Sequence, residues 1–251
     1  MAEERAPALR LAELCWKEFR DLVPARHDGV IIPVGTVEAH GGIPLGTDII
    51  IPESLCEPLA GRFGLIIAPT VNYGVTRSLL PYPGSHTVTS ATFEQYMTEV
   101  FVGFGRMGFR KLVVVNGHGG NINELKGAAR ASYAEADLFS VVLDWWVVAP
   151  EASVEVYGGE GGHGAAEETA GVLAANPALV KPELLEGLKA TRYEEGVFRM
   201  PFPRPVGVQE LGKGMPSMDV EKARRYMALV ERRCAELIEE AFVGWREELG
   251  R

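Results

Sequence analysis

Cysteine is scarce in this sequence. The 251 residues contain only Cys15, Cys56 and Cys234, which lie far apart and form no Cys-x-x-Cys pair. Disulfide frameworks and cysteine-based zinc sites need several cysteines at characteristic spacings, so neither is expected. An odd and dispersed set is typical of a reduced protein in which cysteines pack as small hydrophobic residues. We therefore expect a cytoplasmic protein.

Long apolar runs and clusters of basic residues are also missing. The longest apolar runs, in GVIIPVG and KLVVVNG, fall far short of the roughly 20 residues that a membrane-spanning helix needs. The first residues, MAEERAPALRLAEL, carry mixed charges and lack the apolar core of a secretory signal. The chain has 25 Lys and Arg against 34 Asp and Glu, a net charge of −9, and no Lys/Arg-rich run. These features argue against membrane and nucleic-acid partners.

The composition is that of a globular protein. Apolar residues make up 47% of the sequence, and the mean hydropathy is close to zero, which is typical of a chain with a substantial core. No internal repeat, low-complexity segment or linker-like stretch divides the chain. We predict a single domain over residues 1–251.

Short β-rich runs alternate with longer helical patterns along the chain. The predicted strands, apolar on both faces like central parallel strands, are Gly29–Val37, Leu65–Val71, Lys111–Asn116 and Phe139–Trp145. The predicted helices are Asp48–Arg62, Ser90–Met107, Asn121–Ala136, Ala165–Ala175 and Asp219–Leu249. This alternation predicts a three-layer α/β/α domain with a mostly parallel central sheet. Residues 147–163 and 191–216 lack periodicity and are predicted to be functional loops, the second one shaping specificity.

Distinctive polar residues follow the predicted strands, where an open α/β sheet binds its ligands. Glu38, His40 and Asp48 come after the first strand, and His118 lies in NGHGGN after the third. His163 and Glu168 lie in GGHGAAEETA, at the start of the fourth helix. Each group alone has an ordinary explanation, such as a solvated turn or, for Asp48, a helix cap. Their joint occurrence at three separate places favours a metal site.

The residue types define the chemistry of that site. Imidazole together with carboxylate suits Zn²⁺, Mn²⁺ or Fe²⁺, whereas Ca²⁺ prefers oxygen alone. Glu38 and His40 are two residues apart and point to the same side of an extended chain. Asp48, at a helix start, has two oxygens that can bridge two ions. Two ions roughly 3.5 Å apart would share a hydroxide and polarise a carbonyl, as in metal-assisted hydrolysis.

Two adjacent glutamates in GGHGAAEETA have to be distinguished. If the segment is helical, Val172 and Leu173 mark its inner face, and Glu168, four residues before Val172, lies near that face. Glu167 then falls on the solvent side. We predict that Glu168 is the metal ligand and Glu167 its solvated neighbour. His163 is five residues from Glu168 and must belong to the preceding loop.

These motifs resemble the creatininase (creatinine amidohydrolase) family. GTVEAHGGIPLGTD resembles its Glu-x-His…Pro-Leu-x-x-Asp signature, VVVNGHGGN its Asn-Gly-His motif, and HGAAEETA its His…Glu-Thr motif. YPGSHTVT resembles its Pro-Gly turn, and GVQELGKGMPSMDVEKARR its late loop and closing helix. The resemblance covers most of the chain. It implies a single α/β domain, often assembled into hexamers, that hydrolyses the C–N amide bond of a small molecule with two metal ions.

Roles for individual residues follow from the same resemblance. Glu38, Asp48 and His118 would hold one ion, and His40, Asp48 and Glu168 the other. His163 resembles the family histidine that protonates the leaving nitrogen. Substrate-binding positions are predicted at His86, Trp145, Trp146, Gly119 and Gly120, although core packing is an equally good explanation of the two tryptophans.

Two departures from the family pattern bear on the substrate. The turn reads His-Gly-Gly-Ile-Pro where the family usually has His-Gly-x-His-Leu-Pro, and Gly120 stands where creatininases proper carry an acid. The acidic ligand must then come from elsewhere, which favours Glu168 and disfavours creatinine. Alternatives are a formamide deformylase of flavin or deazaflavin biosynthesis, a peptidase of the mycofactocin precursor, and a catalytically silent binding protein. A Rossmann-type protein is disfavoured because no GxGxxG follows the first strand.

Overall fold

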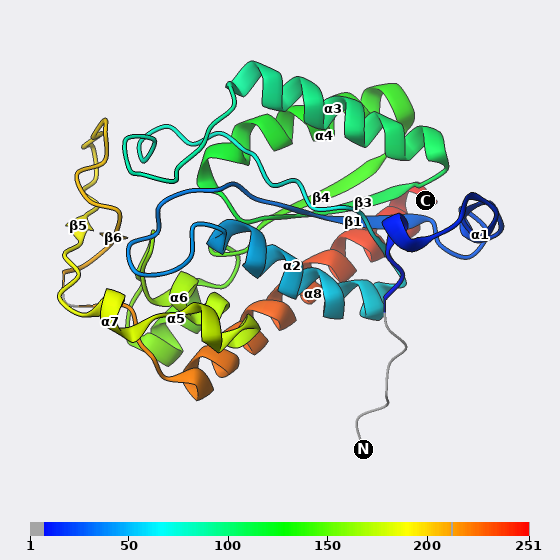
Figure 1. Cartoon of the computed structure of the whole chain (residues 1–251). Coiled ribbons are helices and arrows are strands. Elements are labelled where there is room, and N and C mark those ends of the chain that lie inside the picture. Colours follow the sequence, from blue (N-terminus) through cyan, green and yellow to red (C-terminus); the bar gives the residue numbers. More distant parts are fainter. Residues whose placement is uncertain (1–7, 212, 251) are drawn as a thin grey trace.

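The computed structural model describes residues 8–211 and 213–250, so part of the predicted 1–251 domain, including residue 212 of the 191–216 loop, lies outside the described residues. A four-stranded, all-parallel sheet forms its centre (Figure 1). In spatial order the strands are β2 (Ile66–Ile67), β1 (Gly29–Val34), β3 (Lys111–Asn116) and β4 (Phe139–Asp144). The parallel sheet is confirmed, but β1 and β4 end before the predicted Val37 and Trp145, and β2 is only two residues long.

Helices cover both faces of the sheet. α3 (Ser90–Met107) and α4 (Ile122–Ala136) lie on one face, and α2 (Thr47–Phe63), α6 (Ala166–Ala175) and α8 (Val220–Leu249) lie on the other (Figure 1). Strand side chains alternate between the two layers: Val30 and Ile32 of β1 pack into the core under α3 and α4, while Ile31 packs into the core under α2 and α8. The predicted three-layer α/β/α architecture is therefore confirmed. Both cores share the same strands, and the single domain over residues 1–251 stays a prediction.

The helix boundaries have local causes. Thr89 precedes α3 and its hydroxyl accepts a hydrogen bond from the Thr92 N–H at 3.2 Å, while Asp219 precedes α8 and accepts from the Lys222 N–H at 3.0 Å. Gly108 ends α3 in the left-handed conformation, which glycine adopts without strain. These signals explain why the longer helices were predicted to within a residue at each end.

Several short or edge elements differ from the predictions. α5 (Pro150–Tyr157) occupies about half of the predicted loop 147–163; α1 (Trp16–Leu22) and α7 (Pro182–Leu185) were not predicted. A helix of two turns or fewer shows too few repeats to reveal its period. β4 lies at the edge of the sheet, and its side chains are largely half-buried instead of buried on both faces as predicted.

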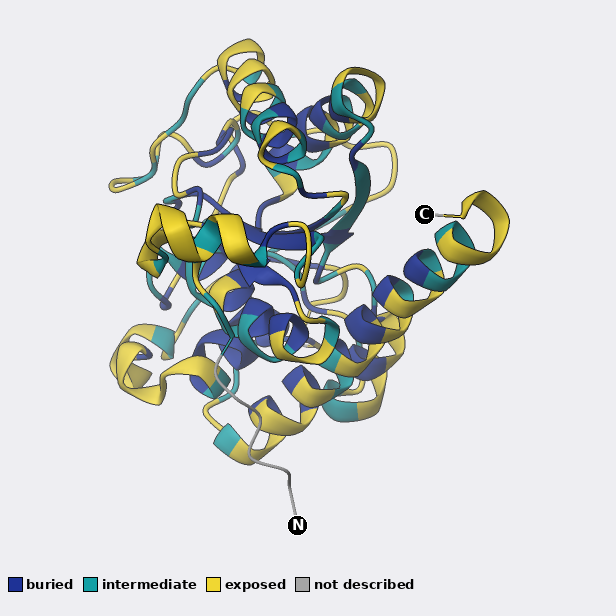
Figure 2. Ribbon diagram, turned by 90° about the vertical axis from the view of Figure 1, so that its right-hand side faces the viewer, coloured by how far each residue is buried: buried dark blue, intermediate teal, exposed yellow. Residues whose placement is uncertain are grey.

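A small second sheet lies beyond the carboxyl ends of the main strands. β5 (Thr191–Arg192) and β6 (Gly207–Val208) pair in parallel within the predicted 191–216 loop. Buried residues concentrate between the helical layers, whereas the outward faces of the helices are exposed (Figure 2). Among the described residues, no helix has the length and apolar character needed to cross a membrane.

Candidate functional site

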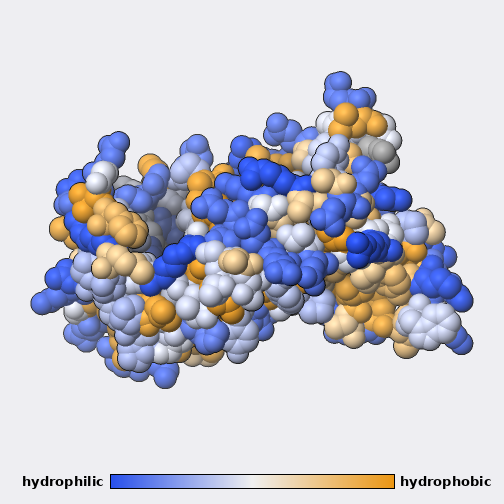
Figure 3. Space-filling view, turned by 90° about the horizontal axis from the view of Figure 1, so that it is seen from above, coloured by the Kyte–Doolittle hydropathy of each residue, from blue (hydrophilic) through white to orange (hydrophobic). Residues whose placement is uncertain are grey.

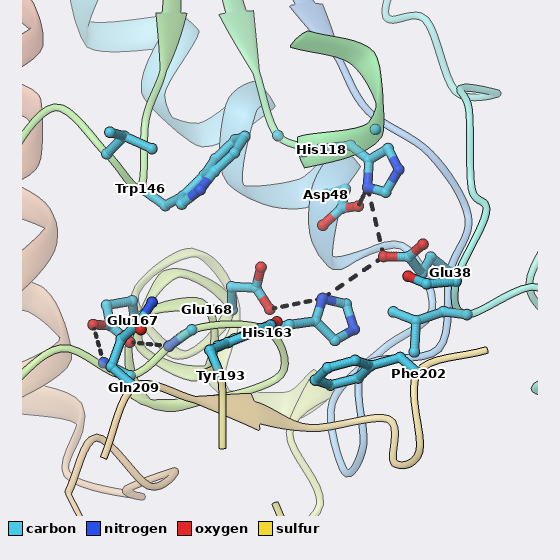
Figure 4. A pocket seen from close by; sticks show the side chains of 18 of the residues that line it. Glu38, Asp48, His118, Trp146, His163, Glu167, Glu168, Tyr193, Phe202 and Gln209 are labelled. Carbon is cyan, nitrogen blue, oxygen red and sulfur yellow. Dashed lines mark hydrogen bonds and ion pairs between the residues drawn. The ribbon is translucent and has the colours of Figure 1, made fainter. Parts of the chain in front are cut away.

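The predicted polar residues converge at the carboxyl ends of the central strands. Glu38 and His40 follow β1, Asp48 lies in the first turn of α2, and His118 follows β3. His163 lies in the loop before α6, as predicted, and Glu168 lies in the first turn of that helix. Figure 4 shows Glu38, Asp48, His118, His163 and Glu168 turned toward one another, and His40 lies against Asp48. All are buried except His163, which is partly exposed.

Asp48 is shared by two groups of possible metal ligands. Its Oδ1 lies 2.8 Å from His40 Nε2, and its Oδ2 lies 2.9 Å from His118 Nδ1. Glu38, Asp48 and His118 form one group, and His40, Asp48 and Glu168 form another. Within each group the ligand atoms lie within 4.8 Å of one another. Two ions sharing the Asp48 carboxylate fit this arrangement of nitrogen and oxygen donors.

Backbone carbonyls fix the orientation of the histidine rings. His40 Nδ1 lies 2.8 Å from the Glu38 carbonyl oxygen, His118 Nε2 lies 3.0 Å from that of Val75, and His163 Nε2 lies 2.8 Å from that of Ala39. A carbonyl only accepts hydrogen bonds, so each of these nitrogens carries the proton. When a ring is neutral, its other nitrogen presents a lone pair toward the carboxylates, which is the usual arrangement of a metal-binding histidine.

Two ligand atoms have no hydrogen-bond partner among the described residues. His40 Nε2 and Asp48 Oδ2 are fully buried, and although they lie 2.8 Å from Asp48 Oδ1 and 2.9 Å from His118 Nδ1, neither contact has the geometry of a hydrogen bond. Buried polar atoms are rarely left in this state, because an unsatisfied donor or acceptor costs about 1–3 kcal/mol. A cation between the lone pairs and carboxylates would satisfy both atoms. The ligand set therefore fits divalent metal ions.

The pKa values of the histidines and carboxylates in this cluster reflect an excess of buried negative charge. Burial lowers the pKa of His40, but Asp48 and Glu168 outweigh it and raise the value to about 10. Burial likewise lowers the pKa of His118, but Glu38 and Asp48 raise it to about 9. Burial raises the pKa of Glu168 to about 8. In the absence of a cation, this cluster retains protons at neutral pH.

His163 differs from the other two histidines. Its Nδ1 lies 3.7 Å from Glu38 Oε1 and 3.9 Å from Glu168 Oε2, and with Glu38 and His40 it forms a third group of possible ligands, which does not include Asp48. Burial and the neighbouring His40 lower the pKa of His163 to about 3, so the ring is neutral at neutral pH. A neutral imidazole with a free Nδ1 lone pair can accept a proton at that atom.

The prediction for Glu167 was wrong. Its side chain is buried, and its carboxylate accepts hydrogen bonds from the Gly161 N–H at 2.6 Å and the Gly162 N–H at 3.3 Å. Eight consecutive residues of α6, from Ala166 to Leu173, are buried because α2 and α8 pack against different sides of this helix. Helical periodicity identifies one inner face only and cannot show that the opposite face is covered as well.

A cavity of about 810 Å³ opens onto the ligand groups. Trp146, Gly119 and Gly120 line it, as predicted for substrate-binding positions. Trp145 instead packs in the core, at 1% exposure, and His86 is exposed and packs edge-on against Tyr73 outside the cavity lining. The two tryptophans lie in the turn that follows β4, with their rings edge to face and the centroids 6.3 Å apart, and only Trp146 faces the cavity.

The segment after α7 supplies cavity residues that were not individually predicted. Tyr193, Phe198, Met200 and Phe202 line the cavity, and the rings of Tyr193 and Phe202 stack with their centroids 5.2 Å apart. Phe198 is 85% exposed at the rim. Apolar surface is visible at the end of the molecule that carries this segment (Figure 3). The only sequence signal was the length of the aperiodic 191–216 loop.

Gly120 stands against backbone and side-chain atoms. A Cβ at this position would collide with the Val75 carbonyl oxygen and lie 2.5 Å from His118 Nε2. No side chain fits here unless the contact between His118 and Val75 is displaced. An acidic ligand cannot come from position 120 in this backbone conformation, whereas Glu168 Oε2 lies 3.6 Å from His40 Nε2.

Comparison with known proteins gives a consistent set of relatives. The profile of the creatininase family, described as creatinine amidohydrolase, matches residues 12–238. Creatinine amidohydrolase of Pseudomonas putida is 30% identical over 189 residues, which cover 68% of this chain and 73% of that protein. The mycofactocin precursor peptide peptidase of Mycolicibacterium smegmatis is 31% identical over 122 residues, covering 45% of this chain and 46% of that protein.

Solved structures are similar over nearly the whole chain. A mutant creatininase of Zn-Zn type and a creatininase described with Mn superpose with TM-scores of 0.80 and 0.79. Both are 26% identical and are matched over 94% of this chain and 99% of theirs.

Proposed function

Because this chain belongs to the creatininase (creatinine amidohydrolase) family, we propose that it hydrolyses an amide bond of a small organic molecule with the help of two divalent metal ions. The family places it among hydrolases that act on C–N bonds. The observation that carries the finer proposal is Asp48, a buried carboxylate shared by two groups of ligands beside His163.

The residues that would hold the ions are those of the two groups. Glu38, Asp48 and His118 would bind one ion, and His40, Asp48 and Glu168 the other. The unpartnered His40 Nε2 and Asp48 Oδ2 and the Zn-Zn and Mn forms of the related structures support this assignment. When bound, such ions acidify a water molecule and polarise a carbonyl oxygen.

His163 is the proposed proton carrier. Its Nε2–H is engaged with the Ala39 carbonyl oxygen, so Nδ1 is the atom available for proton transfer. Nδ1 would accept a proton from the attacking water and then deliver it to the amide nitrogen. A C–O bond forms, the C–N bond breaks, and the products are a carboxylic acid and an amine. Glu38 and Glu168, 3.7 and 3.9 Å from Nδ1, would stabilise the ring while it carries the second proton.

The cavity favours a substrate larger than creatinine. Its volume of about 810 Å³ lies toward the upper end of the range for small-molecule pockets. Trp146, Phe198 and Phe202 line this cavity and offer apolar surface to a substrate. We propose that the substrate carries an apolar group next to its amide. A peptidase is the second candidate, supported by the similarity to the mycofactocin precursor peptide peptidase.

A panel of amides tests the proposal. Creatinine, N-formylanilines, N-acylated aromatic amines and short peptides are assayed with protein freed of metal and reloaded with Zn²⁺, Mn²⁺ or Fe²⁺. We expect metal-dependent turnover of an amide with an apolar substituent; release of formate identifies a deformylase and shortening of peptides a peptidase. Absence of turnover across the panel with metal bound would instead support a silent binding protein. Sedimentation of the same sample tests the predicted homo-oligomer and whether it is a hexamer.

A further inference from the structure

Glu167 is a buried carboxylate with no part in the proposed chemistry. It is 6% exposed, and among the described residues it belongs to none of the groups that could hold a metal ion. In Figure 4 it lies beyond Glu168, on the side away from Glu38 and His118. Burying a carboxylate is unfavourable unless hydrogen bonds compensate, so its partners indicate what it does in this position.

Those partners lead directly to His163. The carboxylate accepts from the Gly161 N–H at 2.6 Å and the Gly162 N–H at 3.3 Å, the two amides that immediately precede His163. The Ser153 hydroxyl of α5 also hydrogen bonds to it. A Cβ on Gly161 would collide with Glu167 Oε2, so the backbone approaches the carboxylate as closely as glycine permits. The loop is thus fastened to the first turn of α6.

The backbone on the other side of His163 is held as well. The Gly164 N–H donates to Glu168 Oε2 at 2.5 Å, and the His163 carbonyl oxygen accepts from the Gly207 N–H at 2.8 Å. Glu168 is also a proposed metal ligand, so its oxygens serve two purposes. The Glu167 carboxylate, in contrast, holds this loop by hydrogen bonds and faces neither group of metal ligands.

We propose that Glu167 is a positioning residue for His163: its carboxylate fixes the Gly161–Gly162 backbone so that Nδ1 of the His163 ring faces Glu38 and Glu168. This inference rests on the proposed role of His163 in amide hydrolysis. Displacing a reacting group by about 1 Å lowers a rate by roughly 100-fold. Replacing Glu167 therefore slows proton delivery without removing a metal ligand.

Glu167→Gln changes the anchor with little change of volume. The carboxamide keeps one oxygen that can accept a hydrogen bond, but its NH₂ group opposes one of the two glycine N–H groups. We expect kcat to fall roughly 100-fold, with KM and bound metal unchanged. The loss should be larger for amides of alkylamines than for amides of nitroanilines, because a weakly basic leaving nitrogen depends less on a proton donor.

A double-mutant cycle separates positioning from a purely structural role. Glu167→Gln should reduce kcat in the natural chain but have no further effect in a His163→Ala background. Glu155→Gln, at an exposed acid of α5 paired with Arg225, is the matched control for charge and should leave kcat unchanged. Ile238→Val in the core of α8 controls for a small loss of stability. An equal fold-loss in both backgrounds, or an unchanged kcat, overturns the proposal.

Hydrogen exchange tests the anchor without any activity. In the metal-free protein, the Gly161 and Gly162 amides should exchange slowly, and Glu167→Gln should accelerate them while Glu155→Gln does not. Unchanged exchange would overturn the inference even if the protein hydrolysed amides. If the wild-type protein hydrolyses no amide, the proposed function fails, whereas accelerated exchange would still demonstrate that Glu167 holds the loop of His163.

Discussion

Replacing Asp48 with alanine removes a group on which both halves of the site depend. In the metal-free protein this carboxylate lies between His40 and His118, 2.8 and 2.9 Å from their nitrogens, and is 2% exposed. Removing one partner from a buried ionic group costs about 3–5 kcal/mol. For a chain of this length each kcal/mol shifts the Tm by roughly 2–4 °C, so Asp48→Ala should lower the Tm by about 6–20 °C.

The same substitution predicts a distinctive metal content. Asp48 belongs to both groups of ligands, so Asp48→Ala should abolish binding of two ions, whereas Glu168→Gln removes a ligand from one group only and should leave about one ion bound. Scanning calorimetry in a chelator and elemental analysis after reloading measure the two effects. Glu53→Ala, at an exposed acid on the same helix α2, is the control and should change neither. Full metal content with an unchanged Tm in Asp48→Ala would refute the bridging role.

Three other outcomes are expected. Gly120→Ala should lower the free energy of unfolding by about 1–3 kcal/mol in denaturant titrations, because its Cβ collides with the Val75 carbonyl; equal stability would contradict the close approach. In metal-free protein, burial lowers the pKa of His40 and of His118, but the neighbouring carboxylates outweigh burial. They raise the pKa to about 10 for His40 and about 9 for His118, above the unfolded value of 6.5. The stability contributed by the two charged histidines is complete below pH 6.5 and is lost as the pH rises through 9–10, so the Tm should fall over that range. Bound Mn²⁺ should reduce this fall, and a Tm independent of pH would contradict the prediction. Phe198→Ala should raise the KM for an aromatic amide about fivefold, equivalent to about 1 kcal/mol. The neighbouring Val197 does not line the cavity, so Val197→Ala should leave KM unchanged. Equal effects of the two substitutions would exclude Phe198 from substrate binding.

The fold was predictable where local signals extend over many residues. α3, with its Thr89 cap and Gly108 terminator, was predicted over its full observed range because eighteen residues repeat the helical period several times. β3 was also predicted in full, since its four central residues, Leu112–Val115, are apolar and buried between helices. α5 and the half-buried side chains of β4 were not predicted. A two-turn helix and the position of a strand at the edge of a sheet leave almost no trace in the sequence.

The site was predictable where side-chain chemistry limits the choice. Imidazoles and carboxylates at the ends of parallel strands must meet, and the predicted clusters around Asp48 have this composition. Glu167 was assigned to the wrong environment because the packing of α8 over α6 is a long-range property. Trp145 and His86 were predicted to bind substrate, yet neither lines the cavity in the structure. Tyr193 and Phe202 reach the cavity through an aperiodic segment that gives no directional signal.

Metal titration of the apoprotein tests the central claim most directly. Mn²⁺ or Zn²⁺ is added in steps to chelator-treated protein while hydrolysis of a responsive amide and bound metal are measured in the same samples. The two groups of ligands that share Asp48 predict that activity is absent without metal and reaches its plateau when two ions per chain are bound. Full activity in the metal-free protein, or a plateau at one ion per chain, would contradict a dinuclear amidohydrolase.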